Sequence, residues 1–129
     1  MASLLLKLGG YGLCRFVVAL LPDVTLVFQS SVLTVCLVGF VYATVAAYRQ
    51  LDLKRFVAYT SIAHMHFIIL SLFTLTDVGY WGSVHSMISH GFISSGLFLM
   101  VGSLYDRFGV RNTAYYSGLA DQMPLFAVF

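Results

Sequence analysis

Apolar residues fill four long stretches of this chain, and short polar turns separate them. A helix that crosses a membrane needs about 20 mostly apolar residues, and each stretch reaches that length. Pro22-Asp23, Arg49-Gln50 and the turn at residues 76–79 mark the breaks. The pattern predicts an all-α integral membrane protein with four transmembrane helices, at about residues 2–21, 24–48, 53–75 and 80–105.

The C-terminal part of the chain is more polar and then turns apolar again. Residues 106–122 are expected to form a loop, with an interfacial helix over 113–122 as the alternative. Residues 123–129 are apolar and predict the start of a fifth span. We therefore expect residues 1–129 to form one group of transmembrane segments.

Composition favours a membrane protein over a soluble domain. Charged residues make up 9% of the chain and glutamate is absent, whereas a soluble domain is about 25% charged. Cys14 and Cys36 both lie in apolar stretches and are interpreted as small buried hydrophobic residues. The sequence contains no Cys cluster and no Gly-rich dinucleotide fingerprint, so no cofactor is expected to bind this chain.

Among the predicted loops, only two contain basic residues. Five of them flank the second and fourth spans, and the turns at Asp23 and Asp77 contain none; the five are Arg49, Lys54, Arg55, Arg107 and Arg111. Short loops rich in Lys and Arg face the cytoplasm or the mitochondrial matrix. Loops 49–55 and 106–112 are therefore expected on that side of the membrane, together with the N-terminus.

Lys7 lies inside the first apolar stretch. A lysine at the centre of a membrane helix costs about 2.5–3.5 kcal/mol and usually marks a pathway or a pairing site. The same stretch contains three glycines and Arg15, and glycines at this density permit close packing against other helices. The segment is therefore expected to need neighbours from a larger bundle.

Two further polar stripes follow helical spacing on the third and fourth spans. Their members are Thr60, Ser61 and His64 on the third, and Ser83, Ser86, His90 and Ser94 on the fourth. Imidazole titrates near neutrality, and hydroxyls can relay protons between fixed sites. We predict a proton-transfer site of Lys7, His64 and His90, with Thr60, Ser61, Ser86 and Ser94 as candidate relay hydroxyls.

Simpler interpretations compete with this one. Membrane hydroxyls often bond to their own backbone or join helices, and this is the favoured interpretation for Thr60, Ser61, Ser83 and Ser95. His64 and His90 taken singly could each be structural, or could together ligate a haem; the presence of Lys7 favours the relay. His66 and His85 are assigned no role.

Three segments in order, LLLKLGGYGLCRF, RQLDLKRFVAYTSIAHM and MISHGFISSGLFLMVGSLYDRFGVR, resemble the family of antiporter-like membrane subunit 4 of respiratory complex I (NADH:ubiquinone oxidoreductase). YYSGLADQMP is similar to the loop before that family's next, broken helix. The resemblance implies a bundle of fourteen helices built from two inverted repeats. This chain would supply the eighth to eleventh helices and the start of the twelfth.

The resemblance also implies roles. Lys7 matches the lysine that connects the two half-channels, and His64 and His90 match the histidines of the central axis. The family's other key acid and lysine groups have no counterpart here, so a second polypeptide is expected to supply the remaining helices. The chain is then a split-gene product or a fragment. NADH, FMN, iron–sulfur clusters and ubiquinone would bind other subunits of the complex.

Function and location follow as expectations. The leading hypothesis is a non-redox, proton-translocating subunit of complex I in the mitochondrial inner membrane, with the basic loops in the matrix. A bacterial plasma membrane, with those loops in the cytoplasm, is the alternative location. The alternative functions are a subunit of a cation/proton antiporter or membrane hydrogenase, and a structural membrane bundle without transport.

Overall fold

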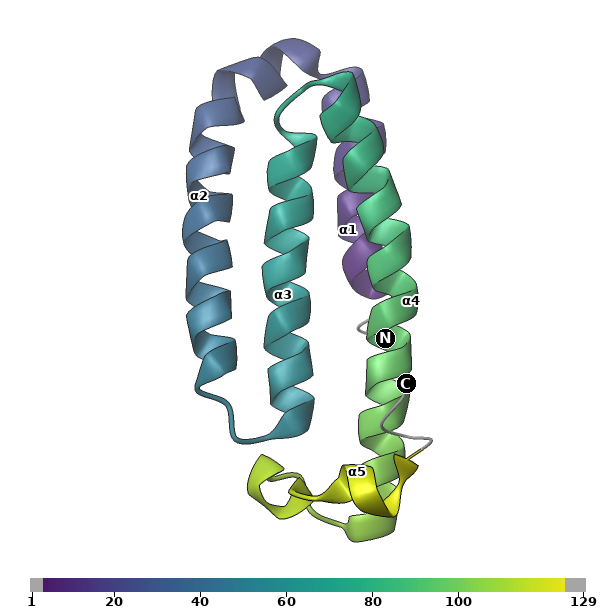
Figure 1. Ribbon diagram of the computed structural model, residues 1–129. Coiled ribbons are helices and arrows are strands. Elements are labelled where there is room, and N and C mark those ends of the chain that lie inside the picture. The colour runs from purple at the N-terminus through teal and green to yellow at the C-terminus, as the bar shows by residue number, and fades with distance from the viewer. Residues whose placement is uncertain (1–3, 125–129) are drawn as a thin grey trace.

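Three long helices make up most of the computed structural model, which describes residues 4–124. Within that range α2 (Pro22–Tyr48), α3 (Leu53–Leu72) and α4 (Asp77–Phe108) are long and apolar enough to cross a membrane. The shortest, α3, is about 30 Å long at 1.5 Å per residue, which matches the hydrocarbon thickness of a bilayer. The helices lie side by side with α3 in the middle (Figure 1). An all-helical membrane protein is thus confirmed for the described residues.

The segment before α2 is a shorter helix of mixed geometry. It consists of α1 (Leu5–Gly12) and a π-helical stretch at Leu13–Val18, and it runs alongside α4 (Figure 1). The helical path from Leu5 to Leu20 is about 24 Å long, less than the roughly 30 Å that a span requires. The span predicted over residues 2–21 is therefore helical where it is described but is not among the three long candidates.

The break before α2 occurs at Pro22, whose ring leaves it without a backbone N–H. The Thr25 hydroxyl, which is 2% exposed, lies 2.6 Å from the Leu21 carbonyl oxygen and 3.2 Å from that of Val17. Both carbonyls also accept a backbone N–H, from Leu21 and Thr25, so the hydroxyl adds a second donor to each. Thr25 thus stabilises the corner that returns the chain toward α3.

The two loops at the opposite end of the bundle are joined to each other. The Leu53 N–H donates to the Arg111 carbonyl over 3.1 Å, and the Thr113 N–H donates to the Leu51 carbonyl over 3.0 Å. Asp52 begins α3 by accepting from the Lys54 N–H at 3.1 Å, a typical helix N-cap. Loops 49–55 and 106–112 therefore lie at the same end of the molecule, as the charge pattern predicts.

The polar C-terminal part forms two short helices rather than one interfacial helix. Gly109 ends α4 with a positive φ of 66°, a conformation that glycine adopts without strain. A 3₁₀ turn at Thr113–Tyr116 and the short α5 (Leu119–Gln122) follow. The predicted start of a fifth span, at residues 123–129, falls mostly outside the described residues.

Small residues mediate the packing of α2 against α3. The buried positions of α2 are Thr25, Cys36, Ala43 and Ala47, whereas most of its large aliphatic and aromatic side chains are exposed, and Val32 and Leu33 pack partly against the core. Small interfacial residues let membrane helices approach closely. The exposed apolar side chains of α2 are suited to contact with lipid or with further helices.

Candidate functional site

Lys7 and His90 meet between α1 and α4, although 83 residues separate them in the sequence. The Nζ atom of Lys7 lies 2.7 Å from Nδ1 of His90. A lysine ammonium has donors and no acceptor, so the ammonium donates and Nδ1 accepts. With Lys7 charged, a neutral His90 ring carries its proton on Nε2, on the side away from Lys7.

Gly10 allows this close approach of α1 to α4. It lies one turn after Lys7 on α1 and is buried. A Cβ atom at this position would lie 2.6 Å from the Sδ atom of Met87 on α4, well inside an ordinary contact distance. The absence of a side chain at Gly10 therefore helps to set the distance between Lys7 and His90.

His64, on α3, extends the site to a third helix. Its ring centroid lies 5.4 Å from that of His90, and the two ring planes are inclined by 56°. Lys7, His90 and His64 therefore form a row that runs from α1 through α4 to α3. The structure brings together all three residues that the sequence predicts as the proton-transfer site.

The row lies well inside the membrane-spanning part of α4. His90 is 13 residues from Asp77 and 18 from Phe108, the two ends of the helix. These separations correspond to roughly 20 Å and 27 Å of helix. Ionisable residues at such depth are rare, face the interior of a bundle or a water-filled cavity, and mark functional pathways.

The predicted relay hydroxyls lie on the same helices and are partly engaged with the backbone. The Thr60 hydroxyl donates to the Val57 carbonyl at 2.9 Å, and the Ser94 hydroxyl donates to the Gly91 carbonyl at 3.3 Å. Ser61 is buried and Ser86 is half-buried. Within residues 4–124 no hydrogen bond joins these four to His64 or His90, so their relay role stays a prediction.

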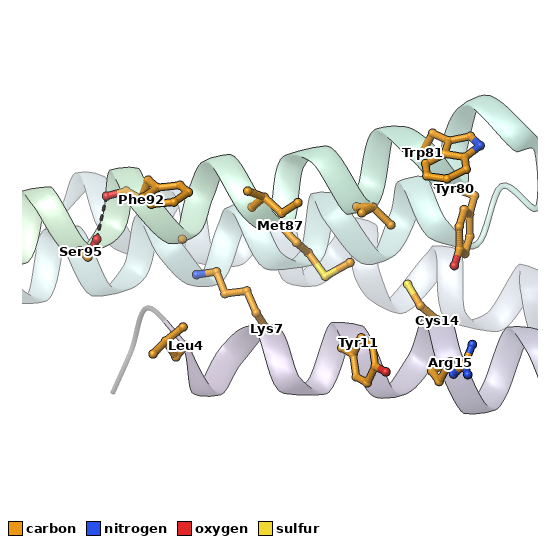
Figure 2. A pocket seen from close by; sticks show the side chains of 13 residues that line it. Leu4, Lys7, Tyr11, Cys14, Arg15, Tyr80, Trp81, Met87, Phe92 and Ser95 are labelled. Carbon is orange, nitrogen blue, oxygen red and sulfur yellow. Dashed lines mark hydrogen bonds between the residues drawn. The ribbon is translucent and has the colours of Figure 1, made fainter.

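Four hydroxyls were predicted to bond to their own backbone or to join helices, and a bond to the backbone is confirmed for three of them. Thr60, Ser83 and Ser95 each donate to the carbonyl three residues earlier, and the Ser95 bond to Phe92 is drawn in Figure 2. The ring of His66 bonds to the Ile62 carbonyl at 2.9 Å and covers Gly39 of α2. His66 therefore packs α3 against α2, apart from the row.

A groove of 760 Å³ runs between α1 and α4, next to the row. Lys7 lies toward one end of the groove, while Arg15 lies at the other end beside Tyr80 and Trp81 (Figure 2). Sequence reasoning assigned no role to Arg15. The spacing alone gives only a weak signal, because eight residues of regular α-helix turn Arg15 about 80° away from Lys7.

The sequence of this chain matches a known protein family over its full length. The family described as "NADH:quinone oxidoreductase/Mrp antiporter, TM" matches residues 1–129. The chain belongs to this family.

The similar proteins come from mitochondria-bearing eukaryotes and from bacteria. NADH-ubiquinone oxidoreductase chain 4 of Acanthamoeba castellanii is 49% identical over 128 residues, which are 99% of this chain and 26% of that protein. The chain 4 protein of Chondrus crispus is 46% identical over 129 residues, which are 100% of this chain and 26% of that protein. NADH-quinone oxidoreductase subunit M of Rickettsia prowazekii is 42% identical with the same coverage. The chain thus spans about a quarter of the length of the relatives that it matches.

Proposed function

We propose that this chain forms part of the proton-translocating membrane arm of respiratory complex I, and that Lys7, His90 and His64 relay protons within it. The observation that carries the proposal is the 2.7 Å contact between Lys7 Nζ and His90 Nδ1 at membrane depth. Similarity to NADH-ubiquinone oxidoreductase chain 4 and to subunit M supports the choice of complex.

The proton positions define a simple sequence of steps. Transfer from Lys7 to Nδ1 of His90 gives a neutral amine and an imidazolium with a proton on both nitrogens. Loss of the Nε2 proton toward His64, through an intervening water or hydroxyl, returns His90 to a neutral ring with its proton on Nδ1. Lys7 then takes a new proton from the opposite side, and the Nδ1 proton must exchange for one on Nε2 before the next cycle.

Thr60, Ser61, Ser86 and Ser94 each lie three or four residues from one of the two histidines, on the same helix. In the proposed relay these hydroxyls carry protons onward, and Thr60 and Ser94 do so by rotating away from the carbonyls to which they donate. Energy for the transfer comes from NADH oxidation and ubiquinone reduction elsewhere in the complex. NADH, FMN, iron–sulfur clusters and ubiquinone bind other subunits in this proposal.

The complete bundle contains more helices than this chain supplies. In the proposed assembly the first helical segment is a fourth span, and residues 123–129 begin a fifth, within a bundle of fourteen. In this proposal a second polypeptide supplies the remaining helices of the same subunit, and other membrane-arm subunits are its partners. The assembly lies in the mitochondrial inner membrane with loops 49–55 and 106–112 in the matrix, or in a bacterial plasma membrane with these loops in the cytoplasm.

Replacement of Lys7 tests the proposal. In the purified complex reconstituted into liposomes, Lys7→Ala should depress both proton pumping and coupled quinone reduction while assembly is retained. The matched control is Lys54→Ala, because Lys54 is an exposed lysine beside a loop and should leave pumping unchanged. Unaltered pumping in the Lys7 variant would make Lys7 a structural residue and would favour the bundle without transport.

His90→Ala should give a milder defect than Lys7→Ala. Removal of the ring leaves space that water can occupy, and water can accept a proton from Lys7 in place of Nδ1. The measurement is the same pumping assay. A defect in His90→Ala larger than that in Lys7→Ala would contradict a relay in which Lys7 is the required group.

A cation/proton antiporter subunit is the second candidate, because the matching family also includes Mrp antiporters. The two functions predict different companions and different transported ions. Purification of the native complex should yield NADH- and quinone-reacting subunits if the proposal holds. Sodium-dependent proton exchange in a complex that lacks redox subunits would establish the antiporter instead.

A further inference from the structure

We infer that the groove between α1 and α4 is the docking site of an apolar membrane helix that brings a carboxylate to Arg15. The groove has a volume of 760 Å³ and is lined mainly by apolar and aromatic side chains, among them Tyr11, Ile88 and Phe92. Two basic residues, Lys7 and Arg15, also line it. The proposal does not depend on proton transfer, since a docked helix is required even if no proton moves.

The position of Lys7 favours protein, rather than lipid, as the occupant of the groove. Lys7 contacts His90, which lies roughly 20 Å of helix from the nearer end of α4. Acyl chains in the groove would surround a half-buried ammonium at that depth with hydrocarbon, an environment that disfavours charge strongly. A helix can cover Lys7 while offering polar groups or water to the remaining ammonium protons.

The charge of the groove identifies the chemistry of that helix. Among residues 4–124, Asp52 and Arg55 form an ion pair at the far end of the molecule. No ion pair in this range involves Arg15. The groove lining contains two cations and no carboxylate. Arginine pairs with a carboxylate through two parallel hydrogen bonds, so an aspartate or glutamate opposite Arg15 complements the groove.

The π-helical stretch turns Arg15 toward the groove. In a regular α-helix, eight residues after Lys7 would place Arg15 about 80° away around the axis, since each residue advances by about 100°. Residues 13–18 form wider π-helical turns, in which each residue advances by less. Arg15 therefore comes closer to the side occupied by Lys7, and both line the same groove. π-helical turns are frequent at functional sites.

The matched relatives offer enough chain to supply such a helix. This chain covers 26% of their length, and about three quarters of each relative therefore lies outside the matched region. Exposed apolar side chains along α1 and the π-helical stretch that follows it, including Leu8 at 62% and Phe16 at 59% exposure, are suited to contact with additional helices. The occupant is thus a helix of the surrounding membrane assembly.

Site-specific photo-crosslinking tests the proposal in the intact complex. Tyr11→p-benzoylphenylalanine places a photoreactive aromatic group in the groove at a position that is 57% exposed. Tyr42→p-benzoylphenylalanine on α2, where the tyrosine is 72% exposed, is the matched control. We expect the Tyr11 probe, and not the Tyr42 probe, to crosslink to an apolar helix that contains Asp or Glu within two turns of the adduct. Adducts with lipid alone, with a helix that lacks an acid, or with a second copy of this chain would overturn the proposal.

Substitution of Arg15 tests the ion pair itself. Arg15→Gln should lower the crosslinking yield from the Tyr11 probe several-fold, whereas Arg15→Lys should retain most of the yield because it keeps the charge. The crosslink requires no turnover, so the result is independent of proton pumping. Equal yields from Arg15→Gln and Arg15→Lys would refute a carboxylate partner.

Discussion

A single methyl group at Gly10 should disrupt the site without altering any ionisable residue. The Cβ of Gly10→Ala would lie 2.6 Å from the Sδ of Met87, whereas ordinary contacts begin near 3.4 Å. If Met87 stays in place, α1 must retreat from α4 by about 0.8 Å. The contact between Lys7 and His90, now 2.7 Å, would lengthen toward about 3.5 Å, beyond the range of a good hydrogen bond.

The effect of Gly10→Ala on the stability of the packed helices can be estimated from two terms, overpacking and helix propensity. Overpacking of this kind costs about 1–3 kcal/mol, while Gly→Ala within a helix gains about 1 kcal/mol. A hydrogen bond to a charged group contributes about 1.5–3 kcal/mol. If loss of this bond raises the activation free energy of proton transfer between Lys7 and His90 by about 1.5 kcal/mol, that step slows by about tenfold.

The control is Gly9→Ala on the same helix. A Cβ at Gly9 meets nothing within 4 Å, so this variant gains helix propensity without a clash. Pumping per NADH oxidised should fall in Gly10→Ala and not in Gly9→Ala, and Met87→Ala should restore it in the Gly10→Ala background. Identical pumping in the two glycine variants, or no rescue by Met87→Ala, would refute the argument that Gly10 sets the Lys7–His90 distance.

Three further predictions concern the packing that holds the site. Thr25→Val should lower the thermal midpoint of the complex by an amount equivalent to about 0.5–1.5 kcal/mol, because the buried hydroxyl's hydrogen bonds to the Leu21 and Val17 carbonyls are lost; Thr44→Val, at an exposed site with a bond to its own helix, should change it little, and equal effects would contradict the role of Thr25. Asp52→Ala should cost about 0.5–2 kcal/mol through loss of the α3 cap, whereas loss of the exposed ion pair in Arg55→Ala should cost less than about 1 kcal/mol; the reverse order in thermal unfolding would refute the capping argument. Gly39→Ala should weaken the packing of α2 on α3, because its Cβ would overlap the His66 ring, and should make the complex dissociate more readily in detergent. Unchanged dissociation of the complex would show that the ring moves aside.

The length and apolarity of the helices could be predicted from sequence, while their exact ends could not. The third span was expected to reach residue 75, but α3 ends at Leu72. Thr76 begins α4 by accepting a hydrogen bond from the Gly79 N–H at 3.1 Å, and Leu75 adopts a positive φ of 55° to make the turn. Leucine gives no sequence signal for that conformation, which residues other than glycine adopt at some cost.

The membership of the site could be predicted from residue types, but its geometry could not. Lys7, His64 and His90 are conspicuous because ionisable groups are rare in apolar stretches. Their arrangement depends on α1 packing against α4 over a separation of 83 residues, and a glycine at position 10 shows its importance only beside Met87. The π-helical stretch that turns Arg15 also has no marker in the local sequence.

A double-variant comparison of Lys7 and His90 tests the proposed relay most directly. Proton translocation per pair of electrons is measured in liposomes for Lys7→Ala, His90→Ala and the combination. Residues that act as one unit show strongly non-additive effects. The relay predicts that the combined variant pumps no less than Lys7→Ala alone. Defects that multiply in the combined variant would show that Lys7 and His90 act independently and would contradict the relay.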